Sequence, residues 1–136
     1  MSVDVGTEIP AWTMPVVDPQ RMKTMAAILR DPYPVHWDHD AVAPITGGGV
    51  INQGPLNLSY IANMLMDWQG PTCIRRLQVR FTDWVLEGDE VTANGTVTSI
   101  DEVDGERRAT CDIRLVRPQG DAVVGTAVVA LLQPGS

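Results

Sequence analysis

The sequence predicts a single α+β domain over residues 1–136, in which a long antiparallel sheet curls around a buried central helix. Two patterns support this fold class. The stretch from Pro55 to Trp68 is apolar around most of a helical circumference. From Thr72 onward, apolar and polar residues alternate with the two-residue period of strands, and glycine-containing turns interrupt the alternation. A chain of 136 residues is long enough to bury one true core.

The N-terminal part is expected to form one strand and one helix. Residues 11–17 predict a short strand. Asp18 and Pro19 mark a helix start, because a carboxylate caps free N–H groups and proline suits the first helical position. This helix is predicted to end near Arg30, and its apolar face consists of Met22, Met25, Ala26 and Leu29. Residues 31–53 show no sustained periodicity, so a long loop is expected there, and long ordered loops are often functional.

The remaining elements are a second helix and four strands. Gly54-Pro55 opens the helix. Alternating residues predict the strands, with Leu77, Val79 and Phe81 in the first, Val91, Ala93, Gly95 and Val97 in the second, residues 107–116 in the third and residues 122–132 in the fourth. Asp104-Gly105 and Gln119-Gly120 lie where hairpin turns belong.

Composition excludes several classes of protein. The formal charge of −7 argues against nucleic-acid binding. No apolar stretch is long enough for a membrane span, and the N-terminal residues lack a signal-peptide pattern, so a cytoplasmic location is expected. Cys73 and Cys111 are expected to be buried free thiols. No metal-ligand spacing is present.

The segment Asp31-Pro32-Tyr33-Pro34-Val35-His36 carries the main chemical signal. It places a carboxylate and an imidazole five positions apart, and the prolines stiffen the backbone between them. Gly54 follows at the start of the second helix. An acid, a base and a backbone N–H at a helix N-terminus are the groups needed to add water to a carbonyl-activated double bond, or to remove it.

These motifs, in this order, resemble those of the MaoC-like hydratases of the hotdog fold, which include (R)-specific enoyl-CoA hydratases and dehydratases. The family signature Asp-x-Asn-Pro-(aliphatic)-His matches residues 31–36 except at Tyr33. The pattern Ile-x-His-Gly appears as residues 51–54, with glutamine in place of histidine. Residues 80–91 are similar to Phe-x-x-Pro-Val-x-x-Gly-Asp-x-Val. The resemblance extends over residues 5–132.

The resemblance implies a single hotdog domain that hydrates enoyl-CoA to the (R)-3-hydroxyacyl thioester, or catalyses the reverse dehydration, in lipid, fatty-acyl or steroid side-chain metabolism. Asp31 would be the principal base, His36 would orient the same water molecule, and the Gly54 N–H would bind the thioester oxygen. The residues expected to contact substrate are Tyr33, Asn52 and Gln53. No cofactor is expected, because coenzyme A is part of the substrate. A homodimer or higher homo-oligomer is expected, and a heteromer with a second hotdog subunit is an alternative.

Other interpretations remain open at this stage. The chain could be a hotdog acyl-CoA thioesterase, although the central helix offers only Asp67 as a carboxylate. It could be a non-catalytic hotdog subunit, or, because Arg30 precedes the aspartate, the dyad-bearing small subunit of a heteromeric steroid side-chain hydratase. Gly54 could simply be the N-cap of the helix, and His39 is expected to be a solvated loop residue. Three arginines could contact the phosphates of coenzyme A, but they are expected to be surface residues of a strand: Arg75, Arg76 and Arg80.

Overall fold

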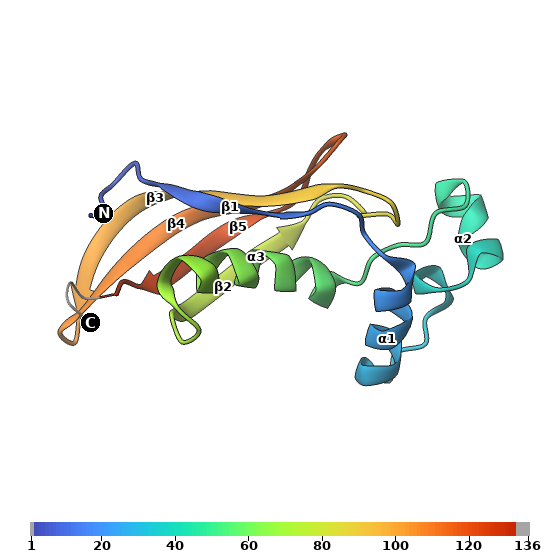
Figure 1. Ribbon diagram of the computed structural model, residues 1–136, viewed down its shortest axis with the longest axis horizontal. Helices are drawn as coiled ribbons and strands as arrows, with labels where there is room; N and C mark the ends of the chain where they lie inside the picture. Colours follow the sequence, from blue (N-terminus) through green and yellow to red (C-terminus); the bar gives the residue numbers. More distant parts are fainter. Residues whose placement is uncertain (1, 133–136) are drawn as a thin grey trace.

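The computed structural model describes residues 2–132 as a curved five-stranded antiparallel sheet with one long helix along its concave face (Figure 1). The strand order is β1-β3-β4-β5-β2. The strands are β1 (Glu8–Met14), β2 (Ile74–Phe81), β3 (Val91–Val103), β4 (Glu106–Arg117) and β5 (Gly120–Ala130). The long helix is α3 (Gly54–Gln69). This arrangement confirms the predicted hotdog architecture.

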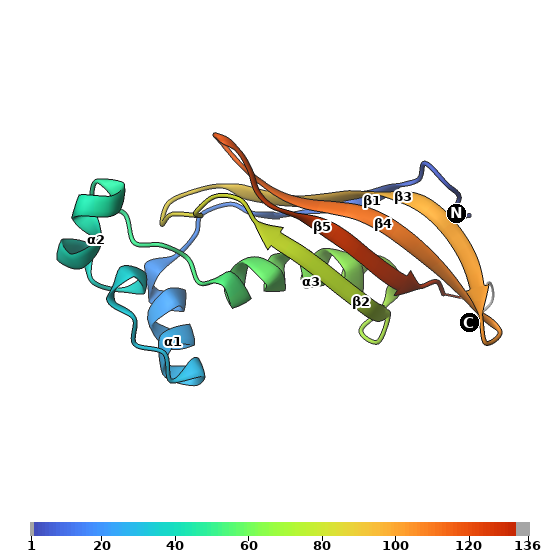
Figure 2. The same cartoon turned by 180° about the vertical axis from the view of Figure 1, so that it is seen from behind.

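The remaining helices lie beyond the N-terminal end of α3 rather than over the sheet (Figure 2). They are α1 (Pro19–Leu29), the short 3-10 helix η1 (Pro34–His36) and α2 (His39–Thr46). Because the start of α3 points toward them, the functional residues predicted in residues 31–54 lie at this one end of the molecule. No helix in the described part of the chain is long and apolar enough to cross a membrane.

The helix α1 forms as the sequence predicts. The carboxylate of Asp18 accepts a hydrogen bond of 2.8 Å from the N–H of Gln20. Arg30 ends the helix in the left-handed region at φ 52° and donates its N–H to the last turn. Met22 and Ala26 are buried, so the predicted apolar face does pack against the rest of the protein.

The predicted loop over residues 31–53 was wrong, because this segment contains η1 and α2. The carboxylate of Asp38 caps α2, and Gly47 ends it at φ 87°. Val42 is the only buried residue of α2, so the helix has no apolar stripe that a periodicity analysis could detect. The first strand is also displaced, since it covers β1 rather than residues 11–17.

The core lies between α3 and the concave face of the sheet. Tyr60, Ile61, Met64 and Leu65 of α3 are all at most 3 % exposed. Each large apolar side chain buried in this way stabilises the fold by about 1.5–3 kcal/mol. The ring of Trp12 on β1 stacks on Tyr60, with ring centroids 5.5 Å apart. The two cysteines are buried within the same core as free thiols.

The turn between β3 and β4 and the pairing of β5 with β2 both depend on glycine. The turn between β3 and β4 places Asp104 and Gly105 at φ 53° and 77°, as a tight hairpin requires. Gly125 on β5 lies against the backbone of β2. A Cβ atom there would overlap the carbonyl oxygen of Gln78 and lie 2.9 Å from the Cα of Val79. The two strands can therefore pair this closely only because residue 125 has no side chain.

Candidate active site

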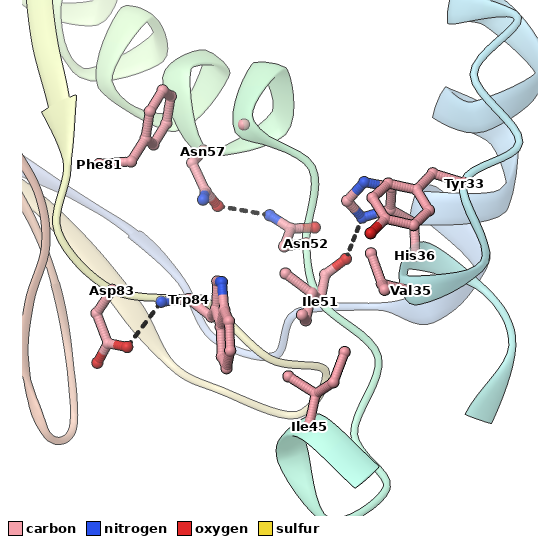
Figure 3. Close-up of a pocket in the computed structure, with 11 residues that line it drawn as sticks. Tyr33, Val35, His36, Ile45, Ile51, Asn52, Asn57, Phe81, Asp83 and Trp84 are labelled. Atoms are coloured by element: carbon pink, nitrogen blue, oxygen red, sulfur yellow. Dashed lines mark hydrogen bonds between the residues drawn. The ribbon is translucent and has the colours of Figure 1, made fainter. Parts of the chain in front are cut away.

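A cavity of about 380 Å³ opens at the N-terminal end of α3 (Figure 3). Three separate segments form its wall: the region from η1 to α2, the first turn of α3 with the residues before it, and the chain that follows β2. The lining residues are Tyr33, Val35, His36, Ile45, Ile51, Asn52, Gly54, Asn57, Phe81, Asp83 and Trp84. Most of these side chains are apolar, and polar groups are concentrated beside the start of α3.

Backbone hydrogen bonds fix the segment that leads into α3 on both of its sides. The N–H of Ile51 donates to the carbonyl of Val35 at 2.8 Å. The N–H of Asn52 donates to the carbonyl of Val85 at 2.7 Å, and the N–H of Glu87 donates to Val50 at 3.0 Å. This pairing sets the start of α3 between η1 and the chain after β2, which brings the three parts of the wall together.

His36 lines the cavity and is held in one orientation. Its Nδ1 lies 2.7 Å from the backbone oxygen of Ile51. Because a carbonyl oxygen can only accept, Nδ1 carries the proton, and in the neutral ring Nε2 is the nitrogen with a free lone pair. The ring of Tyr33 stands edge-on to the imidazole, with ring centroids 5.9 Å apart. The imidazole is therefore presented as a proton acceptor.

Asp31 lies at the end of α1, outside this cavity. Its N–H donates to the carbonyl of Ala26 at 3.0 Å, so its backbone belongs to the helix cap. Its side chain is exposed and is not among the residues that line the cavity. The structure therefore brings His36 and Gly54 to one cavity but not Asp31, and the paired role of Asp31 stays a prediction.

Gly54 is the first residue of α3, and the N-cap is Gln53, so the alternative interpretation of Gly54 as the cap was wrong. Within residues 2–132 the N–H of Gly54 has no hydrogen-bond partner. The position also has little room, since a Cβ atom at Gly54 would lie 3.2 Å from the ring of Phe81. A free N–H at the positive end of a helix can bind a developing negative charge, and a ligand can approach this one closely because glycine has no side chain.

Asn52 belongs to a buried polar group beside Gly54. Its Nδ2 donates to Oδ1 of Asn57 at 2.8 Å and to the hydroxyl of Tyr60 at 3.3 Å. Burial raises the pKa of Tyr60, so its hydroxyl stays protonated at neutral pH, although the hydrogen bond from Asn52 opposes this shift. The Oδ1 of Asn52 is buried and has no partner in the described chain.

Of the three residues expected to contact substrate, Tyr33 and Asn52 line the cavity and Gln53 does not. The side chain of Gln53 turns toward α1, where its Nε2 donates to the carbonyl of Met22 at 2.7 Å. Gln53 is only 2 % exposed. In this structure it holds α1 against the start of α3, and the predicted substrate contact is not visible.

The sequence did not predict five of the lining residues. Ile45 is on α2, Asn57 is on α3, and the others lie at the end of β2 and just after it: Phe81, Asp83 and Trp84. The similarity over residues 80–91 was the only signal for this part of the wall, and it assigned no role to single residues. Asp83 does not supply a free carboxylate, because Arg117 binds it at 3.0 Å and the N–H of Trp84 donates to it at 2.8 Å.

The remaining candidates lie outside the cavity. His39 is on α2 rather than in a loop, and its Nε2 contacts Glu87 at 2.5 Å, with the imidazole side chain 55 % exposed. Arg75, Arg76 and Arg80 lie on β2, and none of them lines the cavity. Among residues 2–132, no group of three or more His, Cys, Asp or Glu residues is arranged to hold a metal ion.

Known structures share this fold over almost the whole chain. The (R)-hydratase from A. caviae, described as involved in PHA biosynthesis, is 29% identical, with a TM-score of 0.82, and the match covers 96% of this chain and 98% of that one. The unliganded R-hydratase PhaJ1 from Pseudomonas aeruginosa is 24% identical (TM-score 0.81, 96% and 84% covered). The ChsH1-ChsH2 complex from Mycobacterium tuberculosis is 21% identical (TM-score 0.82, 96% and 100% covered). At these two lower identities the likeness concerns the fold alone.

None of the curated protein sequences compared with the chain matches it. The model of the MaoC like domain family, in contrast, matches residues 4–116, which is most of the chain. This fold supports hydration and dehydration of enoyl-CoA in general. The chain therefore belongs to the MaoC-like domain family, as its motifs suggested.

Proposed function

We propose that this protein hydrates enoyl-CoA thioesters to (R)-3-hydroxyacyl-CoA, or dehydrates 3-hydroxyacyl thioesters in the reverse direction. One observation carries the proposal: His36, whose Nε2 has a free lone pair, and Gly54, whose N–H has no partner in residues 2–132, line the same cavity. Family membership and the likeness to the (R)-hydratase from A. caviae support it.

In the proposed reaction, Asp31 and His36 hold one water molecule between them. The water oxygen forms a bond to C3 of the enoyl group, one of its protons passes to the Asp31–His36 pair, and a proton is delivered to C2. The negative charge that develops on the thioester oxygen is bound by the N–H of Gly54 and stabilised by the dipole of α3. Acid–base catalysis of this kind contributes about 10²–10⁴-fold, and an oxyanion donor about 3 kcal/mol.

The apolar wall of the cavity fits an acyl chain, fatty or steroid-derived. Ile45, Tyr33, Phe81 and Trp84 line it, and each is about half exposed in the single chain. Together with the free edge of β2, this exposure supports association with a second subunit. A homodimer or higher homo-oligomer is proposed. The alternative is a heteromer with another hotdog subunit, and the Mycobacterium tuberculosis structure is itself a complex of two proteins.

The test is a panel of enoyl-CoA esters, from crotonyl-CoA to bulkier acyl groups, offered to the purified protein while its mass in solution is recorded. Loss of the enoyl absorbance is expected, and the variants Asp31→Asn and His36→Ala are each expected to lower kcat by about 10²–10⁴-fold. His39→Ala, which removes an exposed imidazole outside the cavity, is the matched control and is expected to retain activity. Full activity in both variants would refute the hydratase assignment.

The same assay separates the alternatives. Release of free coenzyme A without loss of the enoyl group would indicate a thioesterase, although Asp67 is exposed near the far end of α3 and does not line the cavity. Activity that requires a second hotdog chain would indicate a heteromer, and the position of Asp31 outside the cavity of the single chain favours a partner of some kind.

A further inference from the structure

The buried carbonyl oxygen of Asn52 is an unusual feature of the cavity wall. Asn52 is 3 % exposed, and its Oδ1 has no hydrogen-bond partner in residues 2–132. Leaving a buried acceptor unpaired costs about 1–3 kcal/mol, so each such group needs an explanation, and a bound ligand is one of them. The other such atom in residues 2–132, Oε1 of Gln53, belongs to a side chain that does not line the cavity. Asn52 also lines the cavity, so a molecule bound there can supply the missing donor.

In this structure the carboxamide of Asn52 is oriented so that Oδ1 is free. Both donor positions of Nδ2 are used, one by Asn57 at 2.8 Å and one by Tyr60 at 3.3 Å. Tyr60 is itself held by stacking on Trp12. In Figure 3, Nδ2 of Asn52 faces Asn57, and Oδ1 lies on the opposite side of the carboxamide, toward His36.

Asn52 lies in the chain between the residue that holds His36 and the residue with the free N–H. The preceding residue, Ile51, binds His36 through its carbonyl oxygen, and Gly54, two residues later, carries the free N–H. His36, Asn52 and Gly54 all line one cavity. Asn52 occupies the unspecified position of the Ile-x-His-Gly pattern, and the sequence predicted a substrate contact for it without saying which atom makes it.

We propose that Oδ1 of Asn52 accepts a hydrogen bond from the oxygen that is added to or removed from C3, which is water in hydration and the 3-hydroxyl in dehydration. The inference rests on the proposed hydratase function. Water has two hydrogens, and only one is transferred: that O–H bond breaks, its proton passes to the Asp31–His36 pair, the oxygen bonds to C3, and C2 gains a proton. The second O–H bond stays intact, and Asn52 accepts from it throughout, which fixes the direction of attack.

The experiment compares hydration by Asn52→Leu, Asn52→Asp and the wild type. Leucine has a similar size but no acceptor, so kcat for crotonyl-CoA is expected to fall about tenfold or more. Aspartate keeps an acceptor at the position of Oδ1 but loses the donor to Asn57, so its kcat is expected to lie between those of Asn52→Leu and the wild type. Asn63→Leu makes the same change in α3 outside the cavity, and no loss is expected. Should Asn52→Leu fail to fold, Asn52→Ala removes the same oxygen without adding bulk.

A binding measurement separates this role from a purely structural one. Butyryl-CoA has no oxygen at C3, so its Kd, measured by calorimetry, is expected to be the same for Asn52→Leu and the wild type. Two results would overturn the inference while leaving the hydratase function intact. One is a Kd of Asn52→Leu for butyryl-CoA that rises by the same factor as its kcat for crotonyl-CoA falls. The other is an unchanged kcat in Asn52→Leu. A wild-type protein that hydrates no enoyl-CoA in the panel would instead refute the proposed function, and this inference with it.

Discussion

Three polar groups at the cavity have the same property: each has one hydrogen-bonding position free, and each is otherwise held in place. Nδ1 of His36 is bound to a backbone carbonyl, which leaves Nε2 free. Nδ2 of Asn52 is bound twice, which leaves Oδ1 free. The N–H of Gly54 is free because it begins a helix. A ligand that binds all three groups would transfer a proton to His36, donate a hydrogen bond to Asn52 and place a negatively charged oxygen at the N–H of Gly54.

The crowded contact between Gly54 and Phe81 leads to a prediction in which activity and stability change in opposite directions. Gly54→Ala places a Cβ 3.2 Å from the Phe81 ring, which must move by a few tenths of an ångström. The ring is half exposed and can do so, and alanine favours the helix, so the free energy of unfolding is expected to stay the same or rise by up to about 1 kcal/mol. Enoyl-CoA hydration is expected to fall about tenfold, because the methyl group occupies the approach to the N–H.

Chemical denaturation and initial rates measure the two effects. Adding Phe81→Leu to Gly54→Ala is expected to recover part of the rate by enlarging the space over residue 54. Wild-type rates in Gly54→Ala would show that no substrate atom approaches this Cα closely, and would remove the oxyanion role.

Local motifs predicted several residues that line the cavity, although Asp31, which belongs to the same motif as His36, lies outside it. Residues whose position depends on distant contacts were harder to predict. His36, Gly54 and Tyr33 were found because their spacing is local, and all three line the cavity. Gln53 was expected at the substrate, but whether its side chain turns to the cavity or to Met22 depends on where α1 packs. Asp83 and Trp84 could not be assigned, because only the return of β2 to the start of α3 brings them to the site.

At the scale of elements, a helix or strand could be predicted from the sequence when its buried side chains recur with the period of that element. The helices α1 and α3 and strands β3–β5 each bury one face, β2 half-buries its apolar side chains, and this spacing shows in the sequence. The helix α2 buries only Val42, so it is stabilised mainly by its capping residues. An element that contributes so little to the core can loosen at low cost, although Ile45 on α2 forms part of the cavity wall.

The capping aspartates of α1 and α2 offer a matched pair of substitutions. Asp18 accepts from the N–H of Gln20 at 2.8 Å, and Asp38 accepts from the N–H of Asp40 at 3.0 Å. Replacing either by alanine is expected to cost its helix about 1 kcal/mol. Only Asp38→Ala is expected to raise KM for enoyl-CoA by several-fold, because α2 carries Ile45 whereas no residue of α1 lines the cavity.

Amide hydrogen exchange in residues 39–46 is the accompanying measurement, and it is expected to accelerate in Asp38→Ala but not in Asp18→Ala. If KM rises equally in both variants, the effect is a general loss of stability, and α2 has no separate part in substrate binding.

At the scale of the whole molecule, an ion-pair group joins strands on both sides of β5. Glu106 at the start of β4 binds Arg75 of β2 at 2.9 Å and Arg108 at 2.7 Å. These hydrogen bonds lower the pKa of Glu106 from 4.5 to about 2. Since β5 lies between β4 and β2, the group joins the two strands that flank β5 at one end of the sheet.

This group predicts an acid-dependent contribution to stability. The folded-state pKa of Glu106 is below its ordinary value, so its contribution is complete above about pH 5 and is lost as pH falls toward 2. In thermal melts at pH 7, the Tm of Glu106→Gln is expected to be lower than that of the wild type. This difference in Tm is expected to shrink between pH 5 and pH 2. Glu102→Gln, an exposed change on β3 with no ion pair in the described chain, is the control. A Tm difference that does not change with pH would contradict the prediction.

Gly125 connects this sheet to the site from a long way along the sequence. Its missing side chain lets β5 pair closely with β2, and β2 ends at Phe81, whose ring covers Gly54. Any methyl group at residue 125 would have to push the outermost strand aside, and the aromatic ring at its tip would shift with it. A position in the middle of β5, outside the cavity, thus limits where the ring of Phe81, one of the lining residues, can lie.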